Sequence, residues 1–303
     1  MAGRDQIPFA GGMGQAAGRP HMSLKDRLID LLWYSGLTEL GRMMLTRNGR
    51  FVLMFHGVSA QKYTGVPREV QPFLTRNDLE TVLSWLRQRH VLLTSKEFLG
   101  GDKPGVLLTF DDGLANNHAN ALPVLQKFEA PAVFFVTLQH ILDPRDLLPG
   151  SRELARMGWG REQAVPKTIA VDIYDGMSVE QLRSCARHPL ITIGSHTISH
   201  PFLTRCGAEE LDREIAGSKR MLEEIINKRV DLFAYPTGDY NREVIQAVKK
   251  AGYQAAFAVE DINEKDSRYE IPRIGLYAST PSYLGLKLSG LYHRPLRTGS
   301  AHG

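Results

Sequence analysis

The fold of this 303-residue chain is decided by one stretch, VLLTFDDG at residues 106–113. Its first five residues form an apolar run of strand length, and two adjacent carboxylates and a glycine follow directly. Because Asp-Gly pairs commonly form turns, an ordinary strand exit would explain this pattern. Two carboxylates that are both partly buried would repel each other and would need a cation or a raised pKa. A plain turn and a functional acidic pair therefore both remain open.

Short apolar runs alternate with helical patterns along most of the chain. This alternation predicts parallel strands joined by helical crossovers. About seven strands with polar residues at their C-terminal ends favour an α/β barrel over an open sheet. We expect strands at 51–55, 106–110, 132–136, 191–194, 232–235, 255–259 and 271–275, and helices at 77–88, 117–128, 178–187, 208–227 and 242–251.

Segments on both sides of the barrel complete the expected domain organisation. Residues 1–22 read as a flexible tail, 23–50 as an amphipathic helical lead-in, 51–290 as the barrel and 291–303 as a C-terminal tail. Apolar residues recur at helical spacing through 23–47, with a break at Ser35-Gly36. Such helices usually pack against the body of a domain. Peripheral contact with a membrane surface through residues 23–47 is the alternative.

Composition excludes several classes of protein. Hydrophobic residues at 43% and charged residues at 23% are globular values. The formal charge is only +4, and basic residues form short pairs, so we expect no nucleic-acid binding. No apolar run reaches the length of a transmembrane helix, and no secretory signal pattern begins the sequence. These features predict a cytoplasmic protein and no oligomeric state in particular.

A second motif, GSHTISHP at 194–201, places His196 and His200 four residues apart at the end of an expected strand. If a helical turn follows that strand, both imidazoles lie on one face. Two imidazoles and one carboxylate are a common ligand set for catalytic zinc. An isolated pair with this spacing is, however, usually incidental.

A third motif, FAYPTG at 233–238, also ends an expected strand. Pro and Gly end strands in many proteins, so alone it indicates little. Its turn can also aim a backbone N–H at a developing oxyanion. In a barrel, the three strand ends converge, and a carboxylate pair, a histidine pair and a backbone donor face one pocket.

The three motifs together resemble the polysaccharide deacetylases, also called the NodB-homology domain or carbohydrate esterase family 4. The resemblance covers roughly 51–275 and includes VLMFHG at 52–57. It implies a deformed (β/α)7 barrel and a divalent metal, expected to be zinc. It also implies roles for the motif residues: Asp111 as catalytic base, Asp112, His196 and His200 as metal ligands, and the Thr237 N–H as oxyanion donor.

The chain departs from the family pattern at two positions. Many members carry an arginine at the position of Ala234, where it holds the catalytic aspartate, and often a tyrosine at that of Thr237. Arg273, at the last expected strand, is our candidate for the missing arginine. The general acid is open between His56, at the end of the first strand, and His293 near the C-terminus.

The resemblance implies a metal-dependent hydrolase that removes N-acetyl groups from a polysaccharide, an oligosaccharide or a lipid-linked precursor. Removal of a formyl group and O-deacetylation are variants of the same chemistry. A catalytically silent barrel that binds carbohydrate or serves as a scaffold is the alternative of another class. The long insertion at 138–177, expected to be irregular, contains Trp159 and Tyr174, which either shape a sugar groove or pack as a loop.

Overall fold

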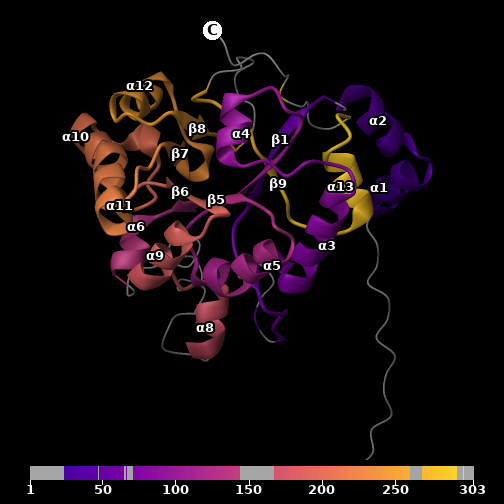
Figure 1. Cartoon of the computed structure of the whole chain (residues 1–303), viewed down its shortest axis with the longest axis horizontal. Helices are drawn as coiled ribbons and strands as arrows, with labels where there is room; N and C mark the ends of the chain where they lie inside the picture. Colours follow the sequence, from indigo (N-terminus) through magenta and orange to yellow (C-terminus); the bar gives the residue numbers. More distant parts are fainter. Residues whose placement is uncertain are drawn as a thin grey trace, which may run out of the picture.

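A parallel sheet organises the molecule. The computed structural model describes residues 24–46, 48–64, 66, 71–143, 167–259, 268–291 and 296. Within these ranges, seven strands form the sheet in the order β8-β7-β6-β5-β4-β1-β9, surrounded by helices (Figure 1). All seven expected strands are present: β1 Arg50–Phe55, β4 Gly105–Phe110, β5 Ala132–Val136, β6 Ile191–Ser195, β7 Leu232–Ala234, β8 Ala255–Phe257 and β9 Ile274–Gly275.

The segment 271–275 closes the sheet into a barrel. On one side, the Ala258 N–H donates to the Ile271 carbonyl at 2.8 Å, and the Ile271 N–H donates to the Ala256 carbonyl at 3.0 Å. On the other side, Ile274 and Gly275 pair with β1. The last segment thus contacts both edges of the sheet, and the expected deformed (β/α)7 barrel is confirmed.

Alternation along the strands divides the apolar core in two. Val52, Leu107 and Phe135 belong to the smaller cluster, which fills the barrel. Their neighbours Leu53, Leu108 and Phe134 belong to the larger cluster, beneath the surrounding helices. Burial on both faces accounts for the continuous apolar runs, since strands of a covered parallel sheet have no solvent face.

Helices cover the outside of the barrel, and several of them begin with a capping box. Thr75 and Asp78 cap α3, and Ser178 and Gln181 cap α9. The expected helices at 117–128 and 208–227 each contain a π-helical turn, at Asn117–Ala121 and Arg213–Gly217. The α-helices around the barrel are α3 Arg76–Arg87, α4 Ser95–Gly100, α5 Leu122–Lys127, α6 Leu138–Leu142, α8 Lys167–Ile173, α9 Val179–Arg187, α10 Ala208–Asp212, α11 Ser218–Ile226, α12 Arg242–Lys250 and α13 Pro281–Lys287.

The insertion at 138–177 was expected to be irregular, and at its two ends this was wrong. Helices α6 and α8 form there because apolar residues such as Leu138, Ile141 and Ile173 are buried. Residues 144–166, which include Trp159, lie outside the described residues. Tyr174 is buried beside Ile173 and therefore packs in a small core.

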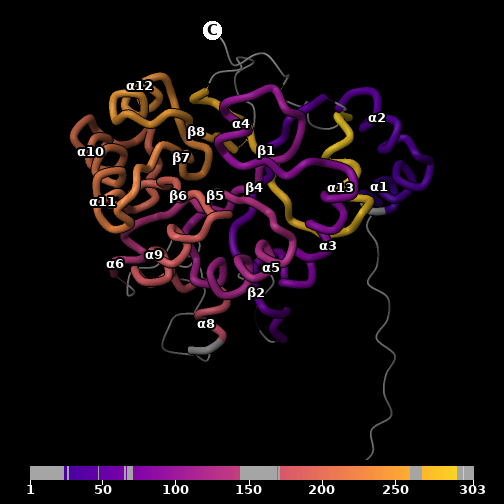
Figure 2. The backbone as a smooth tube through the Cα atoms, in the orientation of Figure 1, coloured from indigo at the N-terminus to yellow at the C-terminus, as the bar shows by residue number. Residues whose placement is uncertain are grey.

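The helical lead-in packs against the body of the barrel. Helices α1, Leu24–Tyr34, and α2, Leu37–Leu45, lie beside α13 although they are far from it in sequence (Figure 2). The Trp33 ring lies 6.5 Å from that of Trp85, centroid to centroid. The predicted break at Ser35-Gly36 is present. The tail expected at 1–22 lies outside the described residues.

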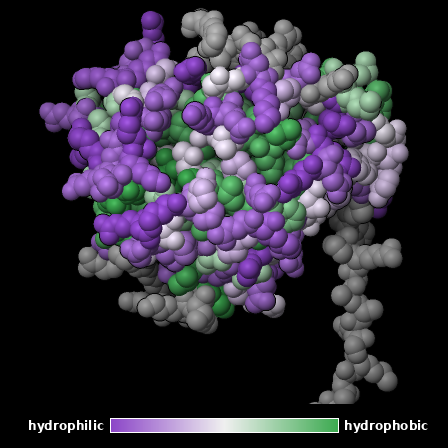
Figure 3. All heavy atoms as spheres, in the orientation of Figure 1, coloured by the Kyte–Doolittle hydropathy of each residue, from purple (hydrophilic) through white to green (hydrophobic). Residues whose placement is uncertain are grey.

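The outer face of the lead-in is apolar. Hydrophobic residues reach the surface over α2, at the upper right of Figure 3. None of the helices in the described ranges has the length and apolarity needed to cross a bilayer. Membrane contact through residues 23–47 therefore stays a prediction. The exposed apolar residues of the two helices are Leu24, Leu28, Leu31, Tyr34, Leu37, Leu40, Met43, Met44 and Leu45.

Beyond the barrel, the structure adds elements that the sequence patterns did not predict. They include α4, α13 and a two-stranded parallel sheet of β2, Val58–Ser59, and β3, Leu74–Thr75. The strands of the small sheet are only two residues long, too short to show a periodicity. In the expected C-terminal tail, Leu296 exchanges two backbone hydrogen bonds with Arg50.

Replacing Gly194 by alanine should destabilise the barrel. A β-carbon there would lie 2.5 Å from the Phe135 ring inside the barrel. Overpacking of this kind costs about 1–3 kcal/mol in the free energy of unfolding. Chemical denaturation measures the loss, and Gly100→Ala on α4, where a β-carbon meets nothing within 4 Å, is the control. Equal stabilities of the two variants would contradict the tight interior packing.

Candidate metal centre and catalytic site

The two acidic residues at the end of β4 differ in backbone conformation and in exposure. Asp111 continues the strand, and its N–H donates to the Phe55 carbonyl at 2.9 Å. Asp112 then adopts a left-handed backbone with φ of 76°, and Gly113 follows with φ of 72°. Such a conformation is rare for a residue with a side chain and is often found at functional sites. The turn leaves the Asp111 side chain buried and that of Asp112 partly exposed.

The histidine motif forms a tight loop at the end of β6. Its backbone is left-handed at Thr197 and again at His200, with φ of 71° and 58°. The Thr197 hydroxyl accepts the His200 N–H at 3.0 Å, which folds the loop back on itself. No helical turn places the two imidazoles together, as the spacing suggested. This loop does so instead.

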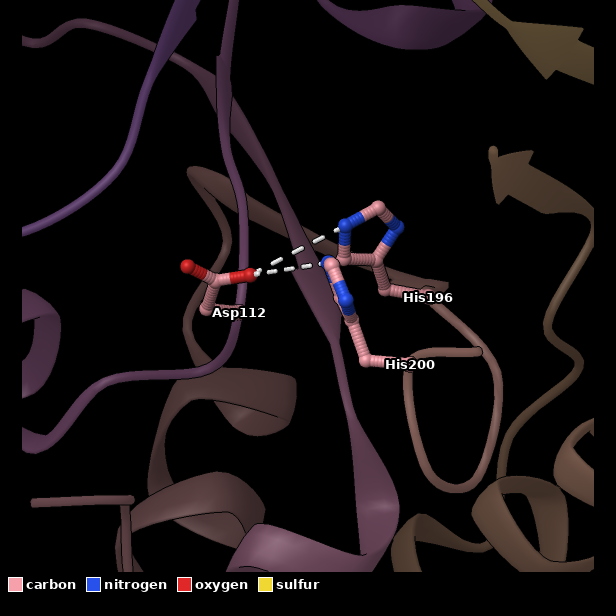
Figure 4. Close-up of side chains that lie close together, drawn as sticks. All are labelled: Asp112, His196 and His200. Carbon is pink, nitrogen blue, oxygen red and sulfur yellow. Dashed lines mark ion pairs between the residues drawn. The ribbon is translucent and has the colours of Figure 1, made fainter. Parts of the chain in front are cut away.

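Asp112, His196 and His200 converge on one point (Figure 4). Asp112 Oδ1 lies 3.8 Å from His196 Nε2 and 3.7 Å from His200 Nε2. The three candidate ligand atoms all lie within 4.8 Å of one another. In a tetrahedral zinc site, neighbouring ligand atoms lie about 3.4 Å apart, close to the two distances from Asp112. Two nitrogens and one oxygen fit a divalent cation of the zinc type.

A backbone hydrogen bond orients His196 toward this point. Its Nδ1 lies 2.8 Å from the Ala234 carbonyl, which can only accept, so Nδ1 carries the proton. The Nε2 lone pair then faces the carboxylates, the arrangement typical of a histidine that binds a metal. Burial lowers the pKa of His196 to about 4, although Asp111 and Asp112 favour its charged form. The imidazole is therefore neutral at pH 7, as metal binding requires.

Arg273 forms a bidentate ion pair with Asp111. Its Nη1 and Nη2 lie 2.7 and 2.9 Å from the two carboxylate oxygens, and both side chains are buried. Nε donates to the Ala258 carbonyl at 3.1 Å. Burial alone would raise the pKa of Asp111, but the guanidinium and the nearby imidazoles of His196 and His56 outweigh it and lower that pKa.

Glu214 anchors the histidine loop from the π-helical turn. One of its carboxylate oxygens accepts the N–H groups of Ile198 and Ser199, each at 2.9 Å, and the other accepts the Ser199 hydroxyl. Sequence reasoning missed this residue. The available signal was an acid on the inward face of an amphipathic helix, between Leu211 and Leu222.

The other predicted site residues are Thr237, His56 and His293. Thr237 sits in the turn Pro236–Gly238 with φ of 57°, and its N–H takes part in neither hydrogen bond that closes this turn. His56 is half-buried and close enough to Asp111 to lower its pKa. His293 lies outside the described residues.

Comparison with known proteins identifies the family. The sequence profile named polysaccharide deacetylase matches residues 100–256. The Bacillus subtilis (strain 168) protein YxkH, assigned by name to the polysaccharide deacetylases, is 28% identical over 217 residues, which is 69% of this chain and 64% of that protein. The chain thus spans about two thirds of that relative. It belongs to the polysaccharide deacetylase family.

Further similarities agree with this. A poly-β-1,6-N-acetyl-D-glucosamine N-deacetylase of Staphylococcus aureus (strain MSSA476) is 23% identical over 66% of this chain and 67% of its own length. IcaB from Ammonifex degensii superposes with a TM-score of 0.60 and 21% identity, covering 81% of this chain and 97% of its own. The Streptococcus pyogenes deacetylase PplD, solved in complex with acetate, superposes with a TM-score of 0.60 and 19% identity. The match covers 80% of this chain and 98% of that one. The two structures share the fold.

Replacing Glu214 by alanine should weaken metal binding. The change leaves two loop N–H groups without their acceptor and frees the loop that carries His200. Loss of a group that orients a ligand typically lowers metal affinity about 10- to 100-fold. Competition with a chromophoric chelator measures the Kd for zinc.

Glu209→Ala, an exposed acid on α10, is the matched control and should bind zinc normally. Glu214→Gln keeps one oxygen acceptor, so its zinc affinity should lie between those of Glu214→Ala and the control variant. Unchanged zinc affinity in a folded Glu214→Ala protein would show that the anchor does not matter.

Proposed function

We propose that the protein is a metal-dependent hydrolase that removes N-acetyl groups from an acetylated saccharide. The observation that carries this proposal is the meeting of Asp112, His196 and His200 beside a second, buried carboxylate, Asp111. A barrel that only binds carbohydrate needs no such combination. A zinc-type cation held by these three residues would supply Lewis acidity to the reaction.

Each role follows from the position of the residue. Asp111, whose pKa is held below its usual range, is ionised at neutral pH and accepts the proton of the attacking water. The Thr237 N–H, which takes part in neither hydrogen bond of its turn, is our candidate donor to the oxyanion that develops on the amide carbonyl. A general acid must then protonate the departing amine. His56 is our candidate because it lies close to Asp111, and His293 stays an alternative.

The substrate class is proposed from the relatives. The Staphylococcus aureus relative is named for poly-β-1,6-N-acetyl-D-glucosamine. We therefore propose an N-acetylated amino-sugar polymer or oligomer, with a lipid-linked precursor as the other form of the same chemistry. Formyl and O-acetyl groups would need the same site, and substrate tests separate them. The cytoplasmic location expected from the sequence stays a prediction.

Acetate release tests the proposal. Zinc-loaded protein should release acetate from β-1,6-linked N-acetylglucosamine oligomers or from chitooligosaccharides, and chelation should abolish release until zinc is restored. Asp111→Asn should lower kcat at least about 100-fold, because it removes the proton acceptor. Asp212→Asn, an exposed acid on α10, is the control. A rate unaffected by chelation or by Asp111→Asn would remove the proposed mechanism.

Replacing Arg273 by alanine should shift the pH dependence of the reaction. Without the guanidinium, burial is no longer offset and the pKa of Asp111 rises. Asp111 then stays protonated to higher pH. The acidic limb of the kcat/KM profile therefore moves to higher pH, and the rate at neutral pH falls. Breaking a buried pair of this kind also costs about 3–5 kcal/mol of stability.

Arg273→Lys keeps the charge and should shift the profile less, because lysine cannot form the bidentate contact. Melting curves at each pH show that the variants are folded. An unchanged acidic limb and rate in Arg273→Ala would show that Arg273 does not position the base.

A further inference from the structure

An exposed aromatic pair lies at the mouth of the barrel. The rings of Phe73 and Tyr277 meet edge to face with centroids 4.8 Å apart, and the two residues are 51% and 40% exposed. Two large aromatic side chains thus meet at the surface, each with a substantial part of its area open to solvent. Contiguous exposed apolar groups often mark binding sites.

Strand register places this pair on the rim of the site. The Leu276 N–H donates to the Met54 carbonyl at 3.0 Å, so Tyr277 lies near the end of β1, where His56 follows. Phe73 directly precedes β3, whose Leu74 pairs with Val58, two residues after His56. Both rings therefore belong to the C-terminal end of the barrel, where the candidate catalytic groups lie.

Gly275 allows the Tyr277 ring to lie over the strand. A β-carbon at Gly275 would come within 2.5 Å of the Tyr277 hydroxyl oxygen and 2.7 Å of the ring carbon that bears it. Every second residue of a strand faces the same side, so positions 273, 275 and 277 share one face. The side chain of Arg273 points into the barrel toward Asp111. The Tyr277 ring thus lies on the same face of β9, at the mouth.

We propose that Phe73 and Tyr277 form a subsite for a sugar residue adjacent to the one that loses its acetyl group. Pyranose rings present C–H groups, which pack favourably on the electron-rich faces of aromatic rings. This inference rests on the proposed function and extends it. It commits the substrate to a chain of at least two sugar residues, held at the β1–β9 side of the mouth.

Chain-length dependence is the signature of such a subsite. The zinc-loaded protein should have a higher kcat/KM for an N-acetylglucosamine tetramer than for the monomer. Phe73→Ala and Tyr277→Ala should each raise KM for the tetramer roughly fivefold to tenfold, the effect of losing one aromatic contact. Neither should change kcat/KM for the monomer. Tyr277→Phe keeps the ring and should behave like the unmodified protein.

Two further variants separate a subsite from a structural role. Gly275→Ala retains both aromatic residues but forces the Tyr277 ring to move. It should therefore raise KM for the tetramer as Tyr277→Ala does. Tyr34→Ala removes an exposed aromatic residue on α1, away from the barrel strands, and should change nothing.

The outcomes distinguish this inference from the proposed function. Activity on the monomer with unchanged tetramer kinetics in Phe73→Ala and Tyr277→Ala would overturn the subsite alone. An equal loss on both substrates would also overturn it, because it would indicate a structural role. If the unmodified protein releases acetate from no saccharide of any length, both proposals are wrong.

Discussion

The buried ion pair of Asp111 and Arg273 is the interaction on which the site depends. A carboxylate enclosed in the barrel would normally take up a proton, because burial disfavours its charge. The guanidinium contacts both of its oxygens and keeps it ionised. Arg273 is itself fixed by the Ala258 carbonyl, so the two charges compensate each other in a defined geometry. The role proposed for Asp111, a base that activates water at neutral pH, depends on this arrangement.

Arg273 also supplies a guanidinium in place of the arginine that many family members carry at the position of Ala234. That position still contributes to the site through its backbone, since the Ala234 carbonyl orients His196. Any residue provides a backbone carbonyl, so an alanine at this position can orient His196. The guanidinium approaches from the segment that closes the barrel.

Much of this architecture could be predicted because it rests on local signals. Buried parallel strands have continuous apolar sequences, and the capping boxes at Thr75 and Ser178 are short-range hydrogen-bond patterns. Backbone conformation at the site was not predictable in this way. Asp112, Thr197, His200 and Thr237 all adopt positive φ, which the surrounding structure imposes. Glu214 was missed for a related reason, since two of its three hydrogen-bond donors are backbone amides, which leave no trace in the sequence.

One short segment both closes the barrel and carries Arg273, the partner of Asp111. Residues 271–275 hold the two edges of the sheet together through few backbone hydrogen bonds, and Arg273 lies between those contacts. Local opening of this seam would withdraw the cation from Asp111 while the other strands stay paired. Asp111 would then lose the cation that keeps it ionised while most of the barrel stays folded, so the charge of this carboxylate depends on closure of the segment 271–275.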